Sequence, residues 1–274
     1  MTSATQPVPA DDPFEDGVSR RLRIAFVGKG GAGKSSIAGT LARLLAAGGE
    51  PVVCLDSDPL PGLATSLGIA TSDAGIPDEA VEEAPEGERA RYRLATGLTS
   101  EAAIRRYADT GPDGVRFLQF GKTRGHTAPL MRSQFAFRHI VADIDDTPWH
   151  VIGDLPAGTR QPFFGWAGFA HLVLVVAEPA MSSMLSAKRL ARLGEGENAP
   201  LVAAIANKTR RDDDADLVSQ ATGLPVWASA PVDPAVREAE HLGVPIIDHA
   251  PDSPTVQALR SLLERLHNEE RSSP

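Results

Sequence analysis

Short apolar runs alternate with helix-length segments along the chain from Arg21 onward. The runs cover residues 22–28, 51–56, 115–120, 149–154, 171–177, 201–207 and 225–230. Most of them are continuously apolar rather than alternating, which is typical of strands that are covered on both faces. We therefore predict that each run is a strand with helices packed above and below it.

The segments between these runs carry helical patterns. One apolar stripe of helical spacing ends at the glycine pair 48–49 and consists of Ile37, Leu41, Leu44 and Leu45. A second stripe begins after residues 253–254 and consists of Val256, Leu259, Leu262, Leu263 and Leu266. Strands that alternate with helices in this way predict an α/β fold. We expect a doubly wound, mainly parallel sheet flanked by helices.

Two segments depart from this rhythm. Residues 1–20 are rich in Pro, Asp, Ser and Thr and have too little apolar content to bury, so we expect a disordered N-terminal tail. Residues 71–97 carry many acidic residues among prolines and glycines, which indicates a solvated insertion or a mobile lid. We read residues 21–274 as a single domain with this acidic insertion.

Length and charge limit the classes of function. At 274 residues, the chain is long enough for one large domain with a buried core. Its net charge of −9 argues against binding to nucleic acid, which requires a basic face. No apolar run reaches the ~20 residues that span a bilayer, and the first residues are neither basic nor apolar like a secretory signal. We expect a cytoplasmic protein with no membrane span.

The sequence GKGGAGKSS at 28–36 follows the first predicted strand and precedes an amphipathic helix. It matches the phosphate-loop pattern G-x-x-x-x-G-K-[ST] in the context that this pattern requires. Small residues let backbone N–H groups surround a phosphate, Lys34 reaches the β- and γ-phosphates, and the Ser35 hydroxyl is a ligand for Mg²⁺. We expect Mg-ATP to contact Gly30, Gly31, Ala32, Gly33, Lys34, Ser35 and Ser36.

An additional lysine makes this loop more specific. With Lys29 the loop reads KGGxGK[ST], and it resembles the deviant Walker A family of P-loop ATPases. That family includes MinD and ParA, the nitrogenase iron protein and the nickel-insertion ATPase of carbon monoxide dehydrogenase, and the last branch is the most similar. The resemblance implies a homodimer bridged by nucleotide, in which Lys29 reaches the partner's nucleotide and supplies positive charge during hydrolysis.

The same resemblance assigns roles to three carboxylates at the ends of predicted strands. The segment LDSDP at 55–59 resembles switch I, which implies that Asp56 lies near the Mg²⁺ and that Asp58 orients or deprotonates the attacking water. The segment GDLPAG at 153–158 resembles Walker B and switch II. It implies that Asp154 contacts Mg²⁺ through water and that Gly158 permits the switch to move when the γ-phosphate is lost.

Three further segments resemble the parts of the family that surround the base. Glu178-Pro179, Asn207-Lys208 and Pro231-Val-Asp233 match the EP, NK and P-x-D elements in the expected order. The resemblance implies that Asn207 hydrogen-bonds adenine and that the backbone near Pro231 lines the base pocket. It covers about residues 21–267.

The chain also departs from its metal-handling relatives, which carry cysteines at the dimer interface. Its one cysteine, Cys54, lies within a predicted strand, where we expect an inert core thiol. The region between the 115–120 and 149–154 strands has no Cys-x-Cys. Near the place of that missing motif, His126 is the candidate for binding a metal instead, and we read it as a solvated loop histidine. Switch I lacks an asparagine after Asp58, because Leu60, Pro61 and Gly62 follow Pro59.

These features lead to one main hypothesis and two alternatives. The main hypothesis is a Mg-dependent ATPase whose homodimer closes on ATP, opens on hydrolysis and acts on a partner protein that the sequence does not identify. The first alternative is a chaperone that inserts nickel or another metal into an enzyme. The second is a positioning or regulatory scaffold like MinD and ParA, although the chain ends in HNEERSSP without the basic face of a membrane-binding helix.

Overall fold

The computed structural model describes residues 21–57, 62–70, 76–85, 92–119, 127–144, 147–158, 162 and 167–272. For residues 127–134 and 270–272 it describes the backbone alone. The expected N-terminal tail, residues 1–20, lies outside these ranges. All statements below concern the described residues.

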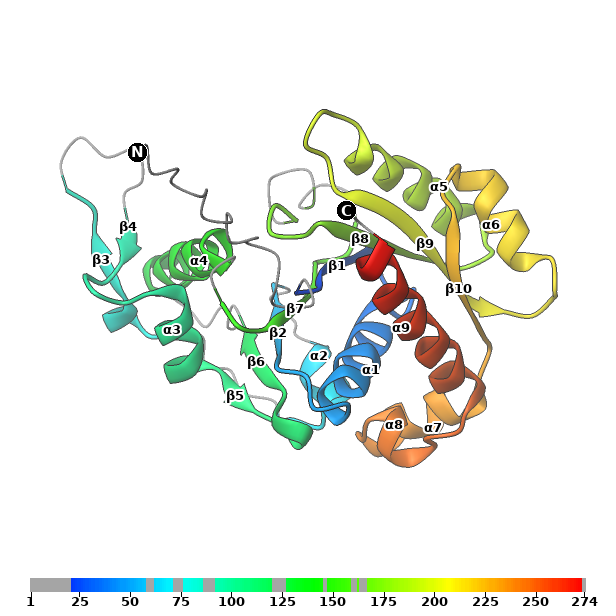
Figure 1. The fold of residues 1–274 in the computed structure, drawn as a ribbon, viewed down its shortest axis with the longest axis horizontal. Coiled ribbons are helices and arrows are strands. Elements are labelled where there is room, and N and C mark those ends of the chain that lie inside the picture. The colour runs from blue at the N-terminus through cyan, green and yellow to red at the C-terminus, as the bar shows by residue number, and fades with distance from the viewer. Residues whose placement is uncertain are drawn as a thin grey trace, which may run out of the picture.

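Strands and helices alternate along the chain as the apolar pattern predicts (Figure 1). The strands within the described ranges are β1 (Arg23–Gly28), β2 (Val52–Asp56), β3 (Val81–Glu83), β4 (Tyr92–Leu94), β5 (Asp109–Thr110), β6 (Arg116–Gln119), β7 (His150–Asp154), β8 (Leu172–Ala177), β9 (Leu201–Thr209) and β10 (Val226–Pro231). The α-helices are α1 (Lys34–Ala47), α2 (Leu63–Leu67), α3 (Ser100–Tyr107), α4 (Thr127–Ala142), α5 (Met181–Leu190), α6 (Asp214–Thr222), α7 (Pro234–Leu242), α8 (Ile246–His249) and α9 (Pro254–Ser272). Three 3₁₀ turns are η1 (Asp78–Ala80), η2 (Pro112–Gly114) and η5 (Ala191–Gly194).

The main sheet has the strand order β10-β9-β8-β1-β7-β2-β6-β5. Its neighbouring strands are parallel, except that β5 pairs antiparallel with β6. The chain adds β2 and β6 on one side of β1 and β8, β9 and β10 on its other side, which is the arrangement of a doubly wound sheet. The predicted fold class is therefore confirmed.

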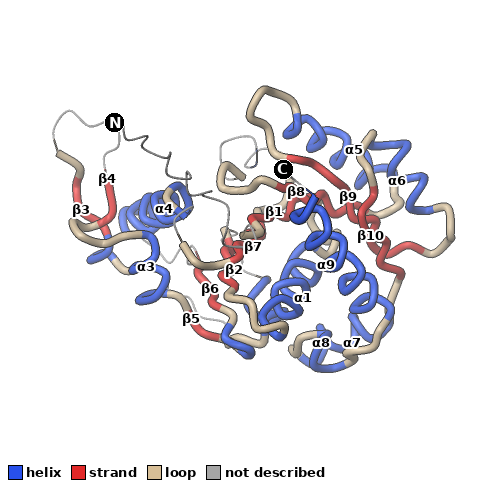
Figure 2. The backbone as a smooth tube through the Cα atoms, viewed as in Figure 1, coloured by secondary structure: helices blue, strands red, loops and turns tan. Residues whose placement is uncertain are grey.

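Helices lie on both faces of the sheet (Figure 2). Each face has its own hydrophobic core. Along β1, Ile24 and Phe26 pack with α1 and α9, whereas Ala25 and Val27 pack into the other core with parts of α4 and α5. Alternate residues of a strand point to opposite faces, so helices on both sides require the continuous apolar runs of the sequence. This two-sided burial holds the strand ends, and the loops that follow them, in fixed positions.

The described part of the acidic segment 71–97 contains η1 and a two-stranded ribbon of β3 and β4. Ala80 and Val81 are buried and belong to the same core as α4, whereas Asp78, Glu79 and Glu83 are exposed. Sequence analysis does not predict these strands, because each has only three residues. The ribbon is attached to the body of the molecule through its apolar side and presents its acidic side to solvent.

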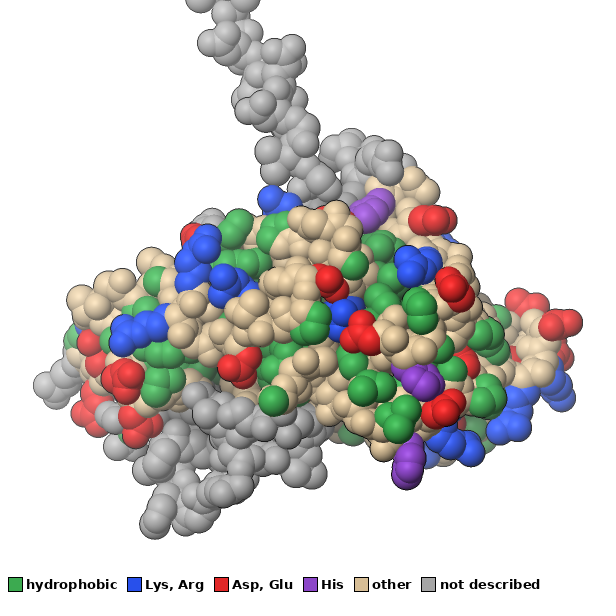
Figure 3. Space-filling view, turned by 90° about the horizontal axis from the view of Figure 1, so that it is seen from below, with side chains coloured by type: hydrophobic (Ala, Val, Ile, Leu, Met, Phe, Trp, Pro, Cys, Tyr) green, Lys and Arg blue, Asp and Glu red, His purple; other side chains and the backbone are tan. Residues whose placement is uncertain are grey.

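The face of the molecule seen from below in Figure 1 carries mixed charge. Acidic and basic side chains are interspersed there with hydrophobic ones (Figure 3). A phosphate backbone lying on this face would meet carboxylates beside its basic contacts.

Candidate functional site

The loop between β1 and α1 lies at the carboxyl end of the parallel strands, where open α/β sheets bind their ligands. Gly33 precedes α1 with a φ of 94°, a left-handed conformation that favours glycine. A side chain at this position would also overlap the amide group of Asn207. The first backbone N–H groups of a helix have no acceptors within the helix, so this end of α1 attracts anions.

Oxygen atoms from three elements surround the start of α1. The Ser35 hydroxyl donates a hydrogen bond of 2.5 Å to Oδ2 of Asp154. Asp154 ends β7 and Asp56 ends β2, and the two residues are directly paired in the register of these neighbouring strands. Both aspartates are buried, and Lys34, which precedes Ser35, is only 8% exposed. The strands thus place a pair of carboxylates at the Ser35 hydroxyl, one residue after Lys34.

The chemistry of this group suits a magnesium ion. Mg²⁺ takes oxygen ligands, usually one or two carboxylates together with substrate phosphates. Two buried carboxylates side by side favour a nearby cation, because like charges in a buried site disfavour each other's ionised form. Ser35, Asp56 and Asp154 therefore fit Mg²⁺ by ligand type. Asp56 is also tied to α2, since the Leu63 N–H donates to its Oδ2 over 3.2 Å.

The far side of the loop is held by β8 and β9. Asn207 donates from Nδ2 to the carbonyl oxygen of Ala32 over 2.7 Å. Lys208, which has a φ of 59°, donates from Nζ to the carbonyl oxygen of Gly31 over 2.6 Å and to Oε1 of Glu178 over 2.9 Å. These contacts fix the backbone of the loop before any ligand is present.

A cleft of about 930 Å³ extends from this loop along α1 toward α7 and α8. Its volume lies in the range of small-molecule sites, ~300–1,000 Å³. The loop end is lined by Gly31, Gly33, Lys34, Ser35 and Ser36. Asn207 and Lys208 line the cleft beside the loop, and Arg210, Pro231, Asp233 and Arg237 line it farther away. The phosphate loop and the segments expected near the base thus lie in one cleft.

Asp233 fixes the far end of this cleft. Its carboxylate accepts hydrogen bonds from the backbone N–H of Ala235 over 3.0 Å and of Thr255 over 3.2 Å, joining the starts of α7 and α9. Burial by itself raises the pKa of Asp233, but hydrogen bonds from Thr255, Ser253 and Ala235 outweigh it and lower the pKa below its ordinary value. The aspartate of the P-x-D segment therefore caps a helix rather than pointing freely into the cleft.

Lys29 lies outside the cleft and contacts its own chain. Its Nζ donates to the Ser182 hydroxyl of α5 over 2.8 Å. On the same helix, Met181 and Leu185 are 78% and 51% exposed. The lysine therefore stands on a surface with exposed apolar side chains.

Some of the sequence-predicted residues cannot be placed. Asp58, Pro59, Leu60, Pro61 and His126 lie outside the described residues. Gly158 is described, and its N–H donates to the Gly28 carbonyl oxygen over 3.2 Å, so it lies beside the phosphate loop. Sequence analysis missed Ser182 and the cleft residues Thr65, Ser66 and Arg237, because none of them belongs to a motif.

Cys54 lies in the middle of β2 and is fully buried. Burial, together with the charges of Asp56 and Asp154, raises the pKa of its thiol well above the usual range. The expectation of a core thiol is therefore confirmed. Among the described residues, no group of three His, Cys, Asp or Glu side chains is arranged to hold a metal ion. No helix in the described ranges is both long and apolar enough to cross a membrane.

A family model for the CobQ/CobB/MinD/ParA nucleotide binding domain matches residues 24–246. The chain belongs to this family. An ATP-binding protein of Methanocaldococcus jannaschii is 28% identical over 82% of this chain and 91% of its own length. The carbon monoxide dehydrogenase accessory protein CooC of Rhodospirillum rubrum is 26% identical over 84% of this chain and 91% of its own length.

Solved structures of the family share the fold. The septum site-determining protein MinD of Pyrococcus horikoshii, solved in complex with Mg-ADP, superimposes with a TM-score of 0.68. Its sequence identity is 18%, and the match covers 90% of this chain and 95% of MinD. A ParA family ATPase of Chlorobium tepidum also gives a TM-score of 0.68, at 18% identity over 89% of this chain and 99% of that protein.

Proposed function

We propose that the chain is a Mg-dependent ATPase of the deviant Walker A type, which forms an ATP-bridged homodimer and acts on a partner protein. The observation that carries the proposal is the hydrogen bond from Ser35 to Asp154, which is paired in register with Asp56, at the start of α1, where Lys34 and Ser35 line a cleft of nucleotide size. A phosphate-binding helix start beside two buried carboxylates is the arrangement that Mg-nucleotide chemistry requires. The ATP-binding relatives and the MinD complex with Mg-ADP support the choice of ligand.

On this proposal, the phosphate end of the cleft binds and orients the triphosphate. Backbone N–H groups of residues 30–36 contact the phosphates, and Lys34 neutralises part of their charge. Ser35, Asp56 and Asp154 hold Mg²⁺, which when bound offsets the charge that develops on the phosphate oxygens. Asp58 orients the attacking water or accepts its proton, as the match to switch I implies.

The other end of the cleft binds the nucleoside. Asn207 stands between the loop and the far end of the cleft, and we propose that its amide contacts adenine. Pro231 ends the neighbouring strand β10, in which Ala230 pairs with Asn207, and we propose that its backbone contacts the base beside Asn207. Lys208 and Glu178 act on the loop rather than on the base, because Lys208 contacts the Gly31 carbonyl oxygen and the Glu178 carboxylate.

The proposed dimer depends on Lys29. The side chain is exposed, and its bond to the Ser182 hydroxyl lies at the surface, so exchanging that partner costs little, about 0.5–1.5 kcal/mol. In the closed dimer Lys29 leaves Ser182 and reaches the nucleotide of the partner subunit. The exposed Met181 and Leu185 beside it are then covered, which favours closure.

Two lysine variants test this assignment. Lys34→Ala removes a charge from the phosphate site, and we expect ATP binding to be lost in calorimetry. Lys29→Ala should still bind ATP but lose hydrolysis and the ATP-dependent doubling of mass in light scattering. Arg260→Ala, which removes an exposed positive charge on α9 instead, is the control and should behave as wild type. Normal dimerisation and turnover in Lys29→Ala would remove the deviant Walker A assignment.

A further inference from the structure

Arg43 is an arginine in the buried part of a helix. It lies on α1, three residues beyond Thr40, which lines the cleft. The residue is only 4% exposed. Burial of a guanidinium costs free energy unless its N–H groups have acceptors. The groups that accept its hydrogen bonds therefore indicate its role.

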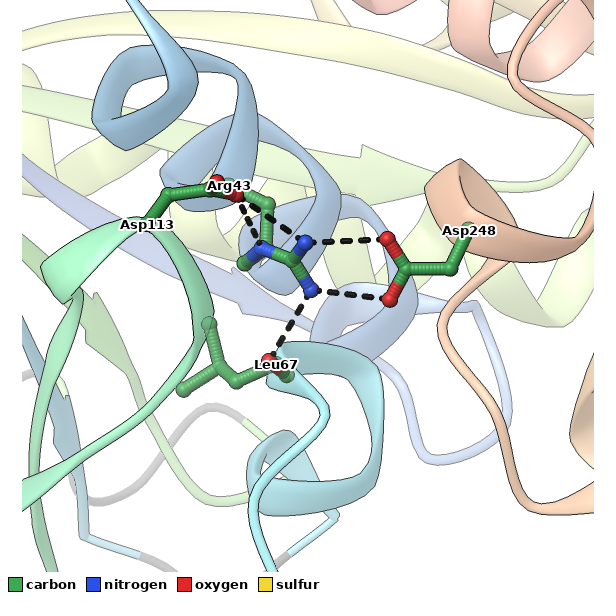
Figure 4. Close-up of polar contacts among 4 residues, drawn as sticks. All are labelled: Arg43, Leu67, Asp113 and Asp248. Atoms are coloured by element: carbon green, nitrogen blue, oxygen red, sulfur yellow. Dashed lines mark hydrogen bonds and ion pairs between the residues drawn. The ribbon is translucent and has the colours of Figure 1, made fainter. Parts of the chain in front are cut away.

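The guanidinium of Arg43 is fully engaged (Figure 4). Nε donates to Oδ2 of Asp113 over 3.0 Å. Nη1 donates to the carbonyl oxygen of Leu67 over 3.2 Å and to Oδ2 of Asp248 over 3.1 Å. Nη2 donates to Oδ1 of Asp248 over 2.9 Å and lies 3.0 Å from Oδ2 of Asp113. One side chain therefore joins α1 to the end of α2, to η2 and to α8.

Two of these partners lie on short helices that line the nucleotide cleft. Asp248 is on α8, and the segment 244–246 at the start of α8 lines the cleft. Leu67 ends α2, whose residues Thr65 and Ser66 also line the cleft. Asp113, by contrast, belongs to η2, which does not line the cleft.

The α2 wall leads directly to the proposed magnesium site. At the start of α2, the Leu63 N–H donates to Asp56 Oδ2 over 3.2 Å. At its end, the Leu67 carbonyl oxygen accepts from Arg43 over 3.2 Å. The helix has only five residues, so its two ends do not move independently. A shift at Leu67 therefore changes the position of Asp56.

We propose that Arg43 is a positioning residue for the nucleotide site. It holds α2 at a fixed position relative to α8. Through α2, it also fixes the position of Asp56. This inference rests on the proposed function, because it assumes that the cleft binds Mg-ATP. Arginine is required because its planar fork bonds a carboxylate in bidentate fashion and a carbonyl at the same time, which a lysine cannot do.

Two aspartate variants separate positioning from simple stabilisation. Asp248→Asn and Asp113→Asn each remove one carboxylate charge from the same guanidinium, at side chains that are 47% and 37% exposed. We expect similar decreases in melting temperature. Only Asp248→Asn should weaken the binding of AMPPNP with Mg²⁺, by about tenfold in the dissociation constant measured by calorimetry, because only Asp248 supports a cleft wall.

Arg43→Lys tests the connection to Asp56. It keeps the positive charge but loses the bond to Leu67, so we expect weaker AMPPNP binding together with a higher Mg²⁺ concentration for half-maximal binding. Equal dissociation constants for Asp248→Asn and Asp113→Asn would overturn the proposal. So would an unchanged Mg²⁺ requirement in Arg43→Lys.

Because AMPPNP is a non-hydrolysable analogue, its binding tests the role of Arg43 separately from ATP hydrolysis. Wild-type protein that binds AMPPNP but never hydrolyses ATP would refute the ATPase and leave the role of Arg43 standing. Wild-type protein that does not bind the analogue would refute both.

Discussion

His150 shows how a single buried residue makes the molecule sensitive to pH. Its Nδ1 accepts a hydrogen bond from the Leu22 N–H over 3.0 Å, so the ring proton is on Nε2, which lies 2.9 Å from Glu50 Oε2. The other oxygen of Glu50 lies 3.2 Å from Nε2 of His267. Burial is the main cause that lowers the pKa of His150, Arg21 and His267 lower it further, and the attraction of Glu50 does not compensate.

We expect the protein to lose stability in mild acid for this reason. The pKa of His150 is lower in the folded than in the unfolded chain, so near the ordinary histidine value of about 6.5 the unfolded chain binds a proton that the folded chain does not. Stability present at neutral pH is therefore lost as the pH falls through that value. Urea midpoints at pH 7.5 and 5.5 measure the loss.

His150→Gln provides the control for this prediction. It removes the titrating ring, so the difference between the two urea midpoints should be smaller than in wild type, although the variant itself should be less stable by about 1–3 kcal/mol because buried partners lose a hydrogen bond. An equal pH difference in both proteins would show that other groups cause the acid sensitivity.

At the scale of elements, the close packing of α1 on α2 depends on a glycine. Gly39 is buried in the interior of α1, and a Cβ there would overlap the Cβ of Ser66 and press on its backbone. An alanine in a helix interior is normally better than glycine by about 1 kcal/mol. At this position we expect the reverse, a loss of about 1–3 kcal/mol from overpacking. Urea unfolding of Gly39→Ala measures it.

The double variant Gly39→Ala with Ser66→Gly is the matched test of that cause. Removal of the Ser66 side chain frees space for the new methyl group. Gly39→Ala should therefore lower the stability less in the Ser66→Gly background than in wild type. Strictly additive losses in the two single variants would mean that the clash is not the cause.

The strands that build the main sheet could be predicted from the sequence because burial on both faces produces continuous apolar runs. All seven predicted runs contain strands of the sheet, from β1 to β10. The elements that were missed, β3, β4 and β5, have three, three and two residues and include polar positions. Such short elements carry no periodicity of their own, since their positions depend on the elements against which they pack.

The arrangement of the site was predictable where its residues form a local pattern or stand at the ends of predicted strands. The phosphate loop has a local pattern, and the placement of Asp56 beside Asp154 follows from two strand ends. The Arg43 network was not predictable, because its partners are 24, 70 and 205 residues away along the chain. No spacing rule relates such positions, although an arginine among the apolar residues 41–47 of α1 is a signal that a buried partner exists.

At the scale of the whole molecule, the buried thiol limits the ways in which the protein handles metals. The chain has one cysteine, and Cys54 is fully buried in β2. Two subunits would therefore bring no exposed thiolate to a shared site, whereas CooC and iron–sulfur cluster carriers are among the relatives.

We expect nickel binding by the dimer to be weak and independent of Cys54. Calorimetry of wild type and Cys54→Ala with Ni²⁺ should give the same result, and both should hydrolyse ATP at similar rates. Tight, stoichiometric nickel binding that is lost in Cys54→Ala would instead support a metal-insertion chaperone. Loss in His126→Ala would do the same and would place the ligand in the 121–140 segment.

The two edge strands of the sheet also limit how copies of this molecule associate. An open sheet invites a second chain to add a strand, which leads to fibres. Here β5 offers only Asp109 and Thr110 at one edge. At the other edge, β10 has two register irregularities and ends in Pro231, which has no N–H to donate. Edge-to-edge polymerisation is thereby discouraged at both borders. The proposed dimer is an association of another kind, because a pair of subunits that closes on itself stops growing.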